Sequence, residues 1–134
     1  MYKKIIVALS LDHGISETAL AKAKRLLDPD GEIIALHVYE AVSGTAAAYI
    51  SEEDLHRSRR TAQQRLEERV RDVPEARAEL VVGHSGRAIA DFAKEQNADC
   101  IIMGSHKPGL SDYFLGSTAA RVVRHAPCSV LILR

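Results

Sequence analysis

The stretch "IIMGSHKPGLSDYFLGSTAARVVRHAPCSVLIL", Ile101 to Leu133, contains an apolar run, a glycine-bearing loop, a helical pattern and a second apolar run. The two runs, Cys100–Met103 and Ser129–Leu133, are nearly continuously apolar, which is typical of strands covered on both faces of a parallel sheet. The spacing predicts a helix from Ser117 to about His125, because Pro127 enforces its end. The stretch therefore predicts two strands joined by a loop and a helix.

The same alternation of apolar runs and helical patterns extends over the rest of the chain. Further strands are predicted at Lys4–Leu9, Glu32–Val38 and Ala78–Val82. Since strands that alternate with helices form one parallel sheet through right-handed crossovers, the order predicts an α/β domain with helices on both faces. One helix is expected from Ser16, as N-cap, with Leu20, Ala23 and Leu27 inward and Asp28–Gly31 as the stop. Two more are expected, one from Ser51 to about Asp72 and one from Ser85 or Gly86 to before Asn97.

The predicted helix after Ser51 is long, and its apolar stripe is thin. Ser51 with Asp54 three residues later resembles a capping box. The stripe consists of Leu55, Ala62, Leu66 and Val70, so the other faces of the helix are expected to be solvated. The segment from Tyr39 to Asp54 has small residues and no clean period before Ser51, and it is predicted as a flexible loop.

The composition fits one soluble domain over residues 1–134. Lys+Arg and Asp+Glu both number 18, so the formal net charge is +0 and gives no broad electrostatic footprint for nucleic acid or an anionic membrane. The arginine-rich stretch His56–Asp72 also carries interleaved acidic residues and is interpreted as a solvated helix face. Aromatic residues are only 4%, which disfavours stacking on nucleobases.

The N-terminal apolar run and the cysteines indicate in which cellular compartment the protein is expected. Ile5–Leu9 is too short for a signal-peptide core or a membrane span, so a cytoplasmic location is expected. Cys100 and Cys128 each lie beside a predicted strand. They are expected to be buried reduced thiols, with a disulfide or redox pair as the alternative.

The glycine-bearing loop is the main candidate for a binding site. In an open α/β sheet, ligands bind outside the carboxyl ends of the strands, and the loops after the first, second and fourth predicted strands lie there. Glycine lets main-chain N–H groups approach an anion, and Gly116-Ser117-Thr118 opens a helix whose positive end favours phosphate. The loop thus predicts a polyphosphate site. The alternative is that Gly104 and Gly116 only make tight turns, with Ser117 as an ordinary N-cap.

Other chemistries find less support in the sequence. Gly104 to Ser111 resembles a P-loop, but Leu110 stands where the essential lysine is needed. The six histidines show no metal-ligand spacing, so a divalent ion is expected only with a bound nucleotide. His84, Ser85 and Asp91 lack a nucleophile elbow, and no residue is an evident general base, so no catalytic residue is assigned.

The chain resembles the universal stress proteins over essentially its whole length. The segments that carry the resemblance are the first strand, Leu36–Val38, "VVGHSGRAIADFAKEQNADCIIMGSH" (Val81–His106) and "GSTAARVVRHAPCSVLILR" (Gly116–Arg134). The resemblance implies a three-layer, Rossmann-like fold with a doubly wound five-stranded parallel sheet in the order 3-2-1-4-5. It also implies ATP binding through G-x-x-G, nine residues, then G-[ST].

This chain keeps part of that pattern and is most similar to a short single-domain bacterial subgroup. Gly104 and Gly116-Ser117 match, but Lys107 replaces the second glycine and only eight residues, Pro108–Leu115, follow it. Ser10 stands where ATP-binding members carry an aspartate, with Asp12 two residues later. The nucleotide-binding residues are predicted to be Ala8, Leu9, Ser10, Asp12, Val38, Met103, Gly104, His106, Lys107, Gly109, Gly116, Ser117 and Thr118. Val38 is nearly as well explained as a core residue.

The resemblance implies a cytoplasmic stress-response protein that binds ATP, ADP or AMP, with or without Mg²⁺, as a sensor or regulator with slow or no hydrolysis. The alternative is a scaffold of the same fold that acts by protein contact alone, which the altered positions Lys107 and Ser10 favour. The apolar last strand would expose unpaired backbone groups. A homodimer through this strand, or a larger assembly, is therefore expected, together with a regulated partner protein.

Overall fold

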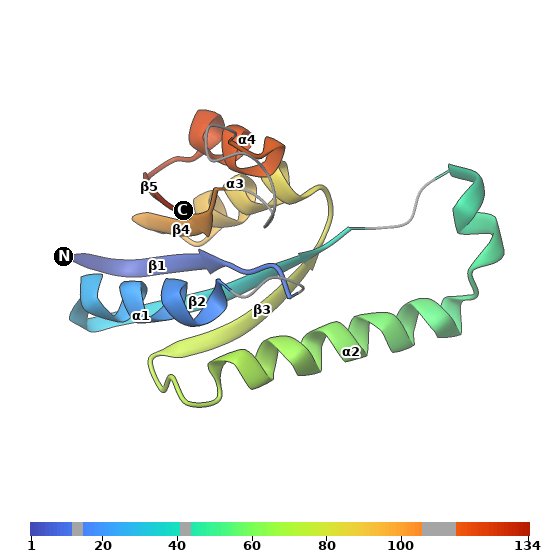
Figure 1. Cartoon of the computed structure of the whole chain (residues 1–134), viewed down its shortest axis with the longest axis horizontal. Helices are drawn as coiled ribbons and strands as arrows, with labels where there is room; N and C mark the ends of the chain where they lie inside the picture. The colour runs from blue at the N-terminus through green and yellow to red at the C-terminus, as the bar shows by residue number, and fades with distance from the viewer. Residues whose placement is uncertain (12–14, 41–43, 106–114) are drawn as a thin grey trace.

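The computed structural model describes residues 1–11, 15–40, 44–105 and 115–134 and forms a five-stranded sheet (Figure 1). All strand pairs are parallel and the order is β3-β2-β1-β4-β5, which confirms the predicted fold class. The elements in chain order are β1 (Tyr2–Ala8), α1 (Ser16–Leu26), β2 (Leu27–Tyr39), η1 (Gly44–Tyr49), α2 (Glu52–Val70), β3 (Ala76–Val82), α3 (Ser85–Glu95), β4 (Cys100–Gly104), α4 (Ser117–His125) and β5 (Ser129–Leu133).

The sheet separates two apolar cores, and each is covered by two helices. Alternate residues of β1 face opposite sides: Ile5 packs in the core beneath α1 and α2, whereas Ile6 packs in the core beneath α3 and α4. Figure 1 shows α1 and α2 below the sheet and α3 and α4 above it. None of the helices in the described part of the chain has the length and apolar character that a membrane span requires.

The boundary between α1 and β2 differs from the prediction. Ser16 is the first helical residue rather than the N-cap, which is Ile15. Leu27 already pairs with Tyr2 in the sheet, and the next pair joins Lys4 to Glu32, so Asp28–Gly31 form an irregularity inside β2. A Cβ on Gly31 would lie 2.8 Å from the main-chain oxygen of Lys3. Glycine therefore lets this irregular segment lie directly against β1.

The connection from β2 to α2 is also more ordered than predicted. Tyr39 belongs to β2, and residues 44–49 form the 3₁₀ helix η1, so the prediction of a loop over the whole segment was wrong. Ser51 is the N-cap of α2, since its Oγ accepts a hydrogen bond from the main-chain N–H of Asp54 at 3.1 Å, which confirms the predicted cap. In Figure 1, η1 and the first half of α2 extend away from the sheet.

Helices α3 and α4 begin and end close to the predicted residues, and they contact each other closely. A Cβ on Gly86 would lie 2.7 Å from the Cβ of Arg121 in α4. This contact explains glycine at a position that the sequence identified only as a helix start.

Both cysteines are free thiols, and they differ in exposure. Cys100 is buried, whereas Cys128 is only partly buried, which corrects the expectation for the second residue. Burial, together with the neighbouring Cys128 and Asp99, raises the pKa of Cys100 from 9.0 to about 11. Burial, with Asp99, also raises the pKa of Cys128.

The raised pKa of Cys100 predicts a loss of stability at alkaline pH. Between its ordinary value of 9.0 and the folded value of about 11, the unfolded thiol has lost its proton while the folded one keeps it. Because the unfolded state then binds fewer protons, the free energy of unfolding falls with rising pH, by up to about 1.4 kcal/mol per pH unit. Urea unfolding at several pH values in this window should show that the free energy of unfolding falls less per pH unit for Cys100→Ala than for the wild type. The same pH dependence in both proteins would contradict the assignment.

Candidate functional site

The candidate site lies at the carboxyl edge of the sheet, where the chain leaves β1 towards α1 on one face and leaves β4 towards α4 on the other. Beyond β1, the N–H of Leu9 donates to the oxygen of Leu36 at 2.8 Å, so this backbone stays attached to β2. Beyond β4, the N–H of Ser105 donates to the oxygen of Leu133 at 2.8 Å. The strand order reverses between β1 and β4, which is where α/β sheets bind ligands.

The start of α4 is held against the end of β4. The N–H of Gly116 donates to the main-chain oxygen of Ser105 at 2.7 Å, which brings the two ends of the glycine-bearing connection together. Gly116 has φ −58° and ψ 156°, a conformation open to any residue. A Cβ on Gly104 would lie 3.3 Å from Cδ1 of Ile15, the end of a side chain that can move. Neither observation shows that a tight turn requires glycine, so the tight-turn alternative gains no support.

The first turn of α4 differs from those of α2 and α3 in what satisfies its N–H groups. The N-cap of α4 is Gly116, which has no side chain to accept a hydrogen bond, whereas Ser51 caps α2. At the start of α3, Glu40 Oε1 accepts from the Oγ of Ser85 at 2.7 Å and from its N–H at 3.3 Å. A protein carboxylate thus occupies the positive end of α3, while α4 presents Ser117 and Thr118 at an end suited to an anion.

The structure brings most of the other predicted site residues to this edge, on two faces of the sheet. Ala8, Val38 and Met103 all pack on the core that α3 and α4 cover. Met103 is 5% exposed, and Ala8 and Val38 are partly buried. Leu9 is buried in the opposite core and Ser10 is partly exposed. Four predicted residues lie outside the described residues, namely Asp12, His106, Lys107 and Gly109.

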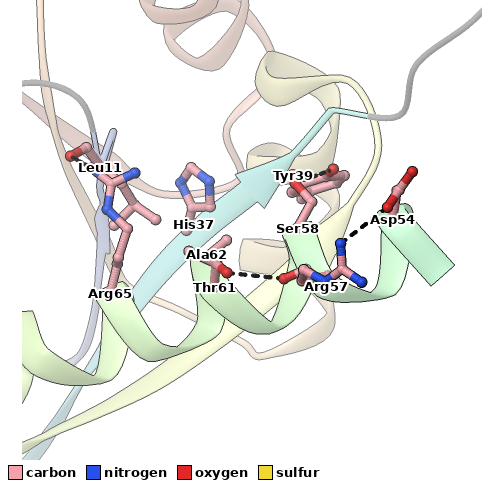
Figure 2. A pocket seen from close by; sticks show the side chains of 9 residues that line it. All are labelled: Leu11, His37, Tyr39, Asp54, Arg57, Ser58, Thr61, Ala62 and Arg65. Carbon is pink, nitrogen blue, oxygen red and sulfur yellow. Dashed lines mark hydrogen bonds and ion pairs between the residues drawn. The ribbon is translucent and has the colours of Figure 1, made fainter. Parts of the chain in front are cut away.

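A separate pocket of about 470 Å³ lies between the end of β2 and α2 (Figure 2). It opens on the α1 and α2 side, away from the core that contains Val38 and Met103. Several of its polar groups bind one another: the Tyr39 hydroxyl donates to Ser58 Oγ at 2.8 Å and Arg57 contacts Asp54 at 3.1 Å. Its lining residues are Leu11, His37, Tyr39, Asp54, Arg57, Ser58, Thr61, Ala62 and Arg65.

Three residues of this edge were not recognised from the sequence: Glu40, Arg65 and Arg69. Glu40 meets Ser85 across 45 residues, and the two arginines bind the loop after β1 across more than 50 residues. The prediction of a solvated helix face is wrong for Arg69, which is partly buried, whereas Arg65 is exposed as predicted and also donates to this loop. Within the described residues, no group of three His, Cys, Asp or Glu side chains comes together as a metal site.

Comparison with known proteins identifies related sequences that match the chain over its full length. The model of the universal stress protein family matches residues 1–134. Universal stress protein G of Salmonella typhimurium is 30% identical over 151 aligned residues, with 100% of both chains covered. A universal stress protein of Thermus aquaticus is 33% identical over 138 residues, again with 100% of both chains covered.

Solved structures show the same fold. Hypothetical protein MJ0577 superposes with a TM-score of 0.82 at 27% identity, covering 99% of this chain and 96% of its own. The universal stress protein from Archaeoglobus fulgidus in complex with dAMP has a TM-score of 0.64 at 22% identity, with 99% and 98% covered. A family protein from Arabidopsis thaliana with AMP bound has a TM-score of 0.63 at 21% identity, with 98% and 90% covered.

Proposed function

The chain belongs to the universal stress protein family, and we propose that it binds an adenine nucleotide at the carboxyl edge of its sheet. The observation that carries the proposal is the first turn of α4, which has a glycine N-cap and is held beside the end of β4 by the 2.7 Å bond from Gly116 to Ser105. The complexes of family members with dAMP and AMP support it.

In this proposal, the phosphates lie against Gly104 and the N–H groups of Gly116-Ser117-Thr118. The nucleoside lies towards the end of β1, beside Ala8, Leu9 and Ser10, with Val38 and Met103 below it. Asp12, His106, Lys107 and Gly109, which lie outside the described residues, are predicted to complete the set. Mg²⁺, where present, is held mainly by the phosphates of ATP.

The biological role proposed is that of a cytoplasmic stress-response sensor or regulator. Occupancy by ATP, ADP or AMP would change the surface offered to a regulated protein, with slow or no hydrolysis. The second candidate is a scaffold that lost nucleotide binding. It is favoured by Ser10 and Lys107, which replace an aspartate and a glycine of the ATP-binding pattern.

Calorimetric titration of nucleotide-stripped protein with ATP, ADP and AMP, with and without magnesium, tests the proposal. Saturable binding of at least one of them is expected, and GTP serves as the matched control for the base. If no adenine nucleotide binds, the scaffold is the correct interpretation. If GTP binds equally well, the site does not distinguish adenine from guanine.

We also propose that β5 forms a homodimer interface. Among the described strands, β5 lies at the edge of the sheet and has β4 as its one neighbour, so its outer side offers backbone groups for pairing. Val123 on the adjoining helix α4 is 51% exposed. Light scattering should give the mass of a dimer or a larger assembly at micromolar concentration. A monomer would refute the interface.

A further inference from the structure

The main-chain oxygen of Leu11, in the loop between β1 and α1, accepts hydrogen bonds from two arginines of α2. Arg65 Nη2 donates to it at 2.6 Å and Arg69 Nη2 at 2.9 Å. Figure 2 shows Arg65 rising from α2 towards Leu11. A carbonyl oxygen has two lone pairs, so this single acceptor can accommodate both donors.

The same loop is held at two further points. Arg69 Nη1 donates to the Oγ of Ser16 at 2.6 Å, and Ser16 is 2% exposed at the start of α1. At the other end, His37 Nδ1 lies 2.9 Å from the oxygen of Leu9; because a carbonyl only accepts, this nitrogen carries the proton. The backbone on both sides of Ser10 is therefore tied to β2 and α2.

The placement of the two arginines is unusual for a solvated helix face. They stand four residues apart, where like charges destabilise a helix, yet both turn to the same oxygen. Charged donors make stronger hydrogen bonds than neutral ones. We call these contacts of Arg65 and Arg69 with Leu11 and Ser16 the arginine clamp.

We propose that Arg65 and Arg69 are positioning residues that set nucleotide affinity without touching the nucleotide. This inference rests on the proposed function. The clamp fixes the backbone at Leu11, next to Ser10, before the nucleoside arrives, so binding does not have to order these residues. By linkage, a bound nucleotide strengthens the attachment of α2 by the same factor. The turns of α2 that carry Arg65 and Arg69 are then the part of the helix that responds to occupancy.

The experiment compares Arg69→Met, the double variant Arg65→Met with Arg69→Met, and the control Arg60→Met on the exposed face of α2. Calorimetry with AMP should show about a tenfold loss of affinity for Arg69→Met, equivalent to about 1.4 kcal/mol, and a larger loss for the double variant. The control should bind as the wild type does. Arg69→Lys keeps the charge but reaches one acceptor only, so its loss should be intermediate, and it replaces Arg69→Met if that variant does not fold.

Hydrogen exchange supplies a readout that a purely structural role would not change. AMP should slow amide exchange in peptides covering residues 62–72 of the wild type, and this slowing should disappear in the double variant. Wild-type affinity in the variants, or unchanged exchange in α2 when AMP binds, would overturn the inference and leave the proposed function standing. Absence of binding of AMP, ADP and ATP to the wild type would overturn both.

Discussion

Gly116→Val should lower the affinity for AMP and ATP by more than about 100-fold, a change of about 2.7 kcal/mol or more in binding free energy. A branched side chain at the N-cap of α4 would stand where phosphate must approach the first-turn N–H groups of Ser117 and Thr118. Calorimetric titration of the variant beside the wild type measures the effect.

The variant is expected to fold, because its backbone does not need glycine. Gly116 has φ −58° and ψ 156°, which valine adopts readily, and the N–H that bonds to Ser105 remains. The matched control is Gly83→Val, a glycine at the same sheet edge where a Cβ would lie 3.4 Å from Ala88, an ordinary contact. Equal affinities of the Gly116 variant and the control would refute the assignment of α4 as the phosphate site.

Elements whose ends are marked by local signals were predicted well. α4 and β5 begin and end as expected, because Gly116 and Pro127 bound the helix and the following run is continuously apolar. The start of β2 was not predicted. It depends on the pairing of Leu27 with Tyr2 and on an irregularity packed against Lys3, and a local pattern contains neither contact.

The same distinction holds for the candidate site. Glycines and hydroxyl residues at a helix start are visible in the sequence, and the structure places Gly104 and Gly116 at one edge. Glu40 at the start of α3 and the arginine clamp depend on partners 45 to 58 residues away. Charge periodicity predicts only that arginines on α2 can be solvated, so it cannot identify the two that donate hydrogen bonds to the main-chain oxygen of Leu11.

Helix α2 joins these observations, because only one of its residues is fully buried against the sheet. Of its 19 residues, Leu66 is the one that is buried, at 0% exposure, within the core beneath α1 and α2. Leu66 stands between Arg65 and Arg69 along the helix, so the apolar anchor and the clamp hold the same turns. The thin apolar stripe predicted from the sequence thus has one fully buried position, while Ala62 and Val70 pack against the same core partly buried.

Leu66→Ala should therefore destabilise the protein by about 4 kcal/mol, through lost burial and the cavity that remains. The matched control is Leu55→Ala on the same stripe, where the leucine is only partly buried near the free end of α2, and a loss below about 1.5 kcal/mol is expected there. Urea unfolding, followed by circular dichroism, gives both free energies. Similar losses at the two positions would show that α2 is held along its whole length, and that neither Leu66 nor the adjoining arginines form its main attachment.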